Sequence, residues 1–213
     1  MTSTDNTLIH HRTVFDDWRS IAIGIYMALV GYGVLVGIPV ISTAWVSQLG
    51  FSEVQVGRVA GADLGGLSVG AVLASFVVAT VNRRLLIVGS IVIAVAANAL
   101  CMIVLSYEWT LWLRFIAGVG SGIYTAVAVA TLGGSSKPAR TFNLLLFAFA
   151  FSQAGELYIL PMLSINSIYT VFILSYLLCL PFLHWVPSRP VDKALDVEIE
   201  VAEPGGGHHI EHR

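Results

Sequence analysis

The chain has 213 residues, of which 56% are hydrophobic and only 11% are charged. Soluble domains carry about 25% charged residues, so this composition excludes an ordinary water-soluble domain, and its apolar bulk excludes a disordered chain. A net charge of −2 gives no broad basic field for nucleic acid. The two cysteines, Cys101 and Cys179, lie inside apolar runs and suggest neither a disulfide framework nor a metal cluster. The composition is that of a membrane protein.

Apolar stretches without charge predict the elements in chain order. No Asp, Glu, Lys or Arg occurs between Arg19 and Glu53, for example, and a helix needs roughly 20 apolar residues to cross the hydrocarbon core. Six windows meet or approach that length: Ile21–Trp45, Val59–Val81, Leu85–Leu105, Leu111–Leu132, Phe142–Met162 and Ile168–Val186. We therefore expect an all-α membrane protein with six transmembrane helices, surrounded by the lipid bilayer.

The basic residues predict how these helices are oriented. They precede the first window, fill the second and fourth connections and follow the sixth window: Arg12, Arg19, Arg83, Arg84, Lys137, Arg140, Arg189 and Lys193. The connections on the opposite side hold only Arg58 among basic residues. Because Lys and Arg concentrate on the cytoplasmic side, both termini are expected to be cytoplasmic in a multi-pass protein of the inner or plasma membrane.

The composition divides the chain into three parts. Residues 1–18 form a polar cytoplasmic segment, residues 19–187 the six-helix domain, and residues 188–213 an acidic, flexible cytoplasmic tail. The tail contains His208, His209 and His212, which are expected to be ordinary polar residues rather than metal ligands. No metal or other cofactor is expected.

Three ionisable residues fall inside the windows, namely Asp63, Arg114 and Glu156. A charge at a helix centre costs about 2.5–3.5 kcal/mol, so such residues usually face a water-filled cavity or pair with each other. Counted along the helices, all three are expected at similar depth in the outer third of the membrane, where they suggest a charge network with one acid able to bind a proton. The alternative is that Arg114 extends to the interface and that Asp63 is hydrated near a helix start.

Polar and aromatic residues extend this candidate pathway. Arg114, Gly118, Ser121 and Thr125 recur at spacings of four, three and four, which places them on one helical face. Gln153 belongs to a weaker polar face with Glu156. Tyr32 and Tyr124 are aromatic candidates for substrate contact, although a packing role is equally open.

Glycines indicate close packing and an internal repeat. Gly57, Gly61 and Gly65 recur every four residues, a spacing that lets helix backbones approach closely. The glycine set Gly31, Gly33 and Gly37 is echoed by Gly118, Gly120 and Gly122. This echo suggests that helices one to three and four to six are two inverted three-helix repeats.

The segment Arg114-Phe-Ile-Ala-Gly118-Val-Gly-Ser-Gly122 resembles the fourth-helix motif of the major facilitator superfamily, and Arg83-Arg84 resembles the basic end of its helix 2–3 motif. The chain departs from the latter motif at Ala79, which occupies its acidic position, and it lacks the family's Gly-Pro antiporter motif in the fifth helix. The resemblance implies the amino-terminal six-helix half of a transporter, in which helices 1, 2, 4 and 5 line the cavity, the motif arginine takes part in proton transfer, and the turn arginines act in gating.

The expected function is therefore transport of a small solute by alternating access, with a proton coupled through Glu156 or Asp63. The resemblance implies a second six-helix half, supplied by a separate subunit or by a second copy. The alternative is a truncated, inactive fragment or a structural membrane partner. An enzyme is not expected, because no His-Glu-x-x-His motif occurs and the residue two before Ser121 is Val119 rather than the glycine of rhomboid-like proteases.

Overall fold

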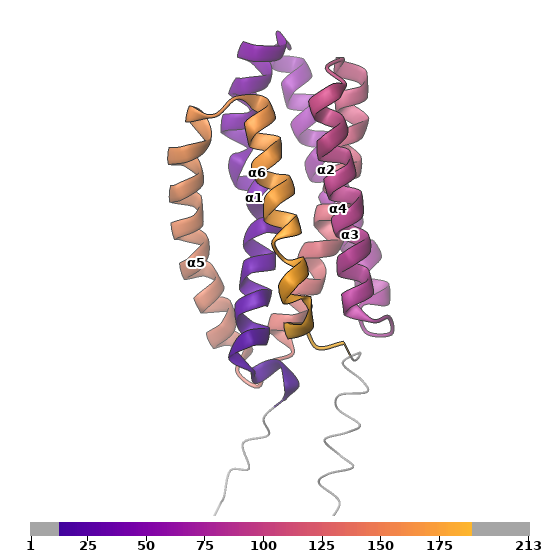
Figure 1. The fold of residues 1–213 in the computed structure, drawn as a ribbon, viewed down its shortest axis with the longest axis vertical. Helices are drawn as coiled ribbons and strands as arrows, with labels where there is room; N and C mark the ends of the chain where they lie inside the picture. The colour runs from indigo at the N-terminus through magenta and orange to yellow at the C-terminus, as the bar shows by residue number, and fades with distance from the viewer. Residues whose placement is uncertain (1–12, 189–213) are drawn as a thin grey trace, which may run out of the picture.

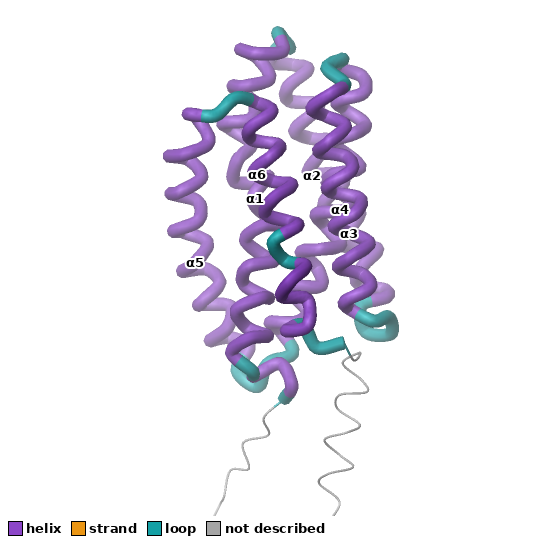
Figure 2. Tube along the Cα trace, in the orientation of Figure 1, coloured by secondary structure: helices purple, strands orange, loops and turns teal. Residues whose placement is uncertain are grey.

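The computed structural model describes residues 13–188, and within that range it contains helices and connections but no strand (Figure 1, Figure 2). The long helices are α1 (Trp18–Leu49), α2 (Glu53–Val77), α3 (Arg83–Ile103), α4 (Tyr107–Gly133), α5 (Pro138–Ile159) and α6 (Ile165–Leu177). Short 3₁₀ helices complete the fold: η1 (Val14–Asp16), η2 (Leu160–Met162) and η3 (Leu180–Trp185). The acidic tail with its three histidines lies outside the described residues.

Six helices, counting η2 with α5 and η3 with α6, are long and apolar enough to cross a membrane, as the sequence predicts. The bounds of the α-helices differ from the expected windows by up to nine residues, and at the start of α2 a capping box explains the difference. Ser52 accepts from the Gln55 amide at 3.3 Å while the Gln55 side chain accepts from the Ser52 amide at 2.9 Å, so α2 begins at Glu53 rather than near Val59. Gly50, at a φ of 70°, makes the tight turn between α1 and α2.

The sixth span is less regular than the sequence predicts. The expected window runs to Val186, but α6 ends at Leu177 and the chain continues as η3 from Leu180. Pro181 explains the break, because a proline lacks the amide N–H and its ring collides with the carbonyl four residues earlier, here that of Leu177.

Consecutive helices cross the bundle in opposite directions, and both ends of the described chain lie at the same end of it (Figure 1). Side-chain contacts hold that end together. Thr13 Oγ1 donates to the Gly134 carbonyl at 3.0 Å, Ser20 Oγ to the Trp185 carbonyl at 3.0 Å, and Arg84 Nε to the Val186 carbonyl at 2.8 Å. The α2–α3 and α4–α5 connections therefore share one end of the bundle with both ends of the described chain.

The helix contacts confirm the two inverted repeats. Three contacts each have an equivalent contact: α2–α4 corresponds to α1–α5, α3–α4 to α1–α6, and α1–α2 to α4–α5. The contacts α1–α4 and α3–α6 correspond to themselves. Exchanging α1 with α4, α2 with α5 and α3 with α6 leaves this set unchanged. Because α1 and α4 run in opposite directions, the second three-helix unit is an inverted copy of the first.

The two halves of this symmetric arrangement are packed differently. At the α2–α4 contact, a Cβ on Gly66 would collide with the Phe115 carbonyl and a Cβ on Gly118 with the Asp63 carbonyl, so the backbones touch directly. The equivalent α1–α5 contact is looser, and Thr141 and Leu145 are the buried residues of α5. Helix α5 is therefore the peripheral member of the bundle.

Candidate functional site

Arg114 and Asp63 form a buried ion pair inside the bundle. Arg114 Nε donates to Asp63 Oδ2 at 2.9 Å, and Nη2 donates to the same oxygen. Arg114 is 0% exposed and Asp63 is 3% exposed. Since neither charge reaches solvent, the two neutralise each other where an isolated charge would be most costly.

The pair is the centre of a polar network that joins five helices. Arg114 Nη1 donates to Asn98 Oδ1 of α3 at 2.7 Å. The Arg114 guanidinium lies 5.7 Å from the centre of the Tyr169 ring of α6, and the Tyr169 hydroxyl accepts from Trp45 Nε1 of α1 at 2.9 Å. Helices α1, α2, α3, α4 and α6 therefore contribute to one connected cluster, and α5 does not.

The predicted polar face of α4 is buried against other helices. Ser121 Oγ donates to the Gly31 carbonyl of α1 at 2.6 Å, and Thr125 Oγ1 donates to the Ser121 carbonyl at 2.8 Å. A Cβ on Gly31 would collide with the Thr125 hydroxyl. In this structure the polar groups of the face thus hold α4 against α1 and α2 instead of facing an open cavity.

Glu156 is separate from this network, and one of its carboxylate oxygens has no hydrogen-bond partner within residues 13–188. It lies on α5, is half-buried, and its Oε1 accepts from Ser152 Oγ at 3.2 Å. Its Oε2 is buried without a hydrogen-bond partner among the described residues. Oε1 lies 3.6 Å from the position a Cβ would take on Gly33, so the glycine leaves room for the carboxylate beside α1.

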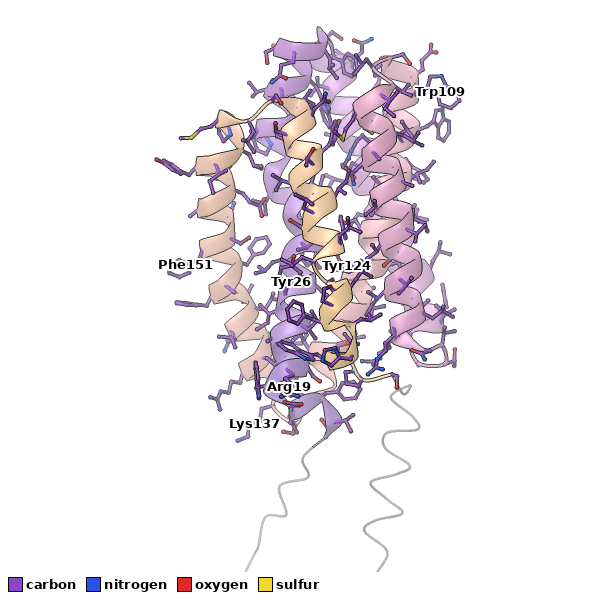
Figure 3. All side chains as sticks on the ribbon, in the orientation of Figure 1. Arg19, Tyr26, Trp109, Tyr124, Lys137 and Phe151 are labelled. Atoms are coloured by element: carbon purple, nitrogen blue, oxygen red, sulfur yellow. The ribbon has the colours of Figure 1, made fainter. Side chains whose placement is uncertain are left out.

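Three predicted pathway residues remain. Tyr32 and Gln153 lie near Glu156, whereas Tyr124 lies in the core of the bundle. Tyr32 of α1 packs edge-on against Phe149 of α5 with ring centres 6.2 Å apart, and both rings are half-buried. Gln153 is exposed on α5. Tyr124 is 0% exposed and packs against Tyr176 with ring centres 5.1 Å apart, inside the core cluster of α1, α3, α4 and α6 (Figure 3).

The turn arginines occupy different environments. Arg83 begins α3 and is 0% exposed; its Nη1 donates to Thr131 Oγ1 at 3.1 Å, and the Phe15 ring covers its guanidinium with the ring centre 4.6 Å from Cζ. Arg84 Nη2 donates to the His184 carbonyl at 2.9 Å. Both arginines therefore fasten the start of α3 to neighbouring segments at the same end of the bundle.

Two of the three membrane charges lie together and the third lies apart. Asp63 and Arg114 share hydrogen bonds between α2 and α4. Glu156 lies beside Gly33, near the midpoint of α1, and its hydrogen-bond partner is Ser152 instead.

Sequence reasoning missed Asn98, Tyr169 and Trp45 as members of the network. Asn98 carried a usable signal, because an amide in an otherwise apolar span needs a polar partner. Tyr169 and Trp45 carried none, since aromatic residues are ordinary in membrane helices. In residues 13–188 no group of three His, Cys, Asp or Glu side chains is placed to hold a metal ion.

Comparison with known proteins gives one family match, which covers most of the bundle. No curated protein matches the chain. Residues 26–187, which are most of the chain and run from α1 to just beyond η3, match the family described as "Uncharacterised MFS-type transporter YbfB". The match agrees with the six spans, the inverted repeats and the glycine-rich α4. The chain therefore belongs to the major facilitator superfamily of membrane transporters.

Proposed function

We propose that this chain moves a small solute across the inner or plasma membrane by alternating access, with Glu156 as the group that binds and releases a coupling proton. The family membership supports transport in general. The observation that carries the proposal is the half-buried carboxylate of Glu156, whose Oε2 has no partner among the described residues. A carboxylate that loses water without gaining hydrogen bonds is costly when charged, and protonation removes that cost.

Asp63 is the less suitable proton carrier of the two acids. Its Oδ2 already accepts two hydrogen bonds from Arg114, and the pair is closed to solvent. Releasing Asp63 would leave the Arg114 charge buried and unpaired, and a guanidinium cannot be deprotonated. We therefore propose that the Arg114–Asp63 pair holds five helices together and that Glu156 exchanges the coupling proton with solvent. The gating role that the resemblance gives to Arg83 and Arg84 belongs to the same proposal.

Alternating access needs a second unit that faces the first across a central site. Helices α2 and α5 are equivalent under the internal symmetry, and both leave much of their surface uncovered. On α2, Gly57 and Gly61 have no atom within 4 Å of a Cβ, and on α5 the polar Asn143 and Gln153 are exposed. Small and polar residues on these two helices favour a protein neighbour over lipid tails, so we propose that a second six-helix unit, from a separate chain or a second copy, covers them.

The test uses purified protein in vesicles that contain a pH-sensitive dye and carry an imposed pH gradient. Solutes that raise the melting temperature of the protein are added one at a time, and we expect at least one to start a proton flux. Glu156→Gln keeps the shape of the side chain but cannot release a proton, so it should abolish the solute-dependent flux while solute binding remains.

Glu108→Gln is the matched control, because Glu108 is an exposed acid in the first turn of α4. It should behave like the unaltered protein. Solute-dependent proton flux that survives Glu156→Gln would contradict the assigned role. Solute binding without any flux, from protein whose mass in detergent is that of one chain, would instead favour the inactive-fragment alternative.

A further inference from the structure

A cavity of about 770 Å³ lies between α1 and α5 at the end of the bundle that carries both ends of the described chain. It lies beside the start of α5, where Thr141 and Leu145 are the buried residues of that helix. The lining residues of α1 are Trp18, Ile21, Ala22 and Ile25, and those of α5 are Arg140, Thr141, Leu144 and Ala148. The connection before α5 completes it with Ser135, Ser136 and Lys137, and Asp16 lies at the same end.

The mouth of the cavity carries positive charge that has no partner among the described residues. Lys137 and Arg140 are exposed, and neither donates a side-chain hydrogen bond or forms an ion pair within residues 13–188 (Figure 3 shows Lys137 at this end). The only acid in the lining, Asp16, is occupied by the protein itself. Its Oδ1 accepts from the Ser136 amide at 2.8 Å and from Ser136 Oγ at 2.9 Å, and its Oδ2 accepts from the Thr13 amide at 2.8 Å.

These contacts fix the charge of Asp16. Burial alone would raise its pKa, but the hydrogen bonds from Thr13 and Ser136 outweigh burial and hold the pKa below the ordinary value. Asp16 therefore stays a carboxylate, and the mouth carries one positive charge in excess, with two cationic side chains free to move toward a ligand.

The wall farther from the mouth is apolar and reaches about 15 Å along α5, roughly half the thickness of a bilayer core. Ala22, Ile25, Leu144 and Ala148 have no polar side-chain atoms, and Ala148 lies about 15 Å along α5 from Pro138. A hydrocarbon core is about 30 Å thick, so the cavity spans the depth of one leaflet. A ligand that fits it has a long apolar part and a negative head at the level of the helix ends.

We propose that this cavity binds one anionic phospholipid, with an acyl chain between α1 and α5 and the phosphate against Lys137 and Arg140. Basic residues beside transmembrane helices favour anionic headgroups, and each contributes on the order of a fivefold gain in affinity. The occupied site would fill the space between α1 and the first half of α5, and α5 is the helix that carries Glu156. The site is separate from the Glu156 carboxylate, so the proposal does not depend on proton coupling.

The experiment measures lipid binding to the purified, delipidated full chain by native mass spectrometry. The probes are phosphatidylglycerol and phosphatidylcholine with the same acyl chains, and glycerol 3-phosphate as a soluble anion. We expect one phosphatidylglycerol to be retained in preference to phosphatidylcholine. Lys137→Gln together with Arg140→Gln should weaken that binding roughly 30-fold, and Ala148→Trp, which fills the apolar end of the cavity, should also weaken it.

Arg58→Gln is the control, because Arg58 is an exposed arginine of α2 near the opposite end of the bundle. It should leave binding unchanged, and the circular dichroism spectrum of every variant should show the same helix content. Equal retention of the two lipids, or equal loss on Arg58→Gln, would overturn the proposal. Displacement of the lipid by glycerol 3-phosphate at similar concentration would show a site for a soluble anion and would also overturn it.

Discussion

Arg114 and Asp63 differ in what each can do when its partner is removed. A carboxyl group left alone in an apolar interior can accept a proton and become neutral, whereas a guanidinium stays charged. Both side chains are closed to solvent in this fold. Which of the two residues is replaced should therefore affect the stability of the protein more than the number of hydrogen bonds that is lost.

We accordingly expect Asp63→Asn to destabilise the protein more than Arg114→Met. Leaving the guanidinium without a counter-charge should cost about 3–5 kcal/mol, as for other broken buried pairs. Thermal unfolding in detergent shows which of the two variants is less stable. The double variant should recover part of the lost stability, because it buries no charge. Glu53→Gln, at an exposed acid at the start of α2, should have little effect. The opposite order of the single variants would show that the pair is not the source of the stability.

The sequence predicts which charged residues matter in the membrane but not how they are grouped. An ionisable residue in an apolar window is visible because it is costly there, so Asp63, Arg114 and Glu156 could all be identified. Which acid pairs with Arg114 depends on helix rotation and packing, and these are set by contacts far apart in the sequence. Asp63 pairs because Gly118, one turn beyond Arg114 on α4, lets the α2 backbone approach at Asp63 itself.

At the scale of the helices, the glycines of α2 form two sets with different surroundings. Gly66 and Gly70 face the backbone of α4, and Gly118 and Gly122 of α4 face the backbone of α2. Gly57, Gly61 and Gly65 have no atom within 4 Å of a Cβ. Both sets show the four-residue spacing, so the spacing alone does not distinguish the glycines that hold α2 against α4 from the uncovered ones.

This difference predicts opposite results for two similar substitutions. Gly118→Ala places a methyl group against the Asp63 carbonyl, so α2 and α4 must separate, and we expect a loss of about 1–3 kcal/mol. Gly61→Ala meets no atom and should leave stability the same or slightly higher, since alanine favours the helix. Urea or thermal unfolding of the two variants, side by side, measures the effect. A tolerated Gly118→Ala would mean that the helices are further apart than described.

At the scale of the whole molecule, the sequence predicts the number of spans and their repeat better than it predicts how individual helices pack. The number of spans and the inverted repeat could be predicted because hydrophobic length and glycine placement recur at the scale of whole helices. The looseness of α5 could not, because its composition resembles that of the other spans and the gap beside it arises from packing. The same holds for η1, whose Phe15 is 2% exposed and covers Arg83 although it lies outside every predicted span.

The direction of the bundle in the membrane remains a prediction, and it can be tested with two exposed positions. Thr80 lies in the α2–α3 connection and Ser106 before α4, at opposite ends of the bundle. The native Cys101 and Cys179 are both buried, so a cysteine placed at either position is the accessible one within residues 13–188. Because the end that contains Thr80 carries the basic connections, we expect it to face the cytoplasm.

A membrane-impermeant maleimide added to intact cells should therefore label Ser106→Cys and not Thr80→Cys, and opening the membrane should expose Thr80→Cys to the reagent. The unaltered protein is the control for labelling of native cysteines. Ser136→Cys, in the α4–α5 connection, should behave like Thr80→Cys because the fold places both at the same end. Labelling of Thr80→Cys in intact cells would reverse the orientation, and it would place Lys137, Arg140 and the cavity beside them in the outer leaflet.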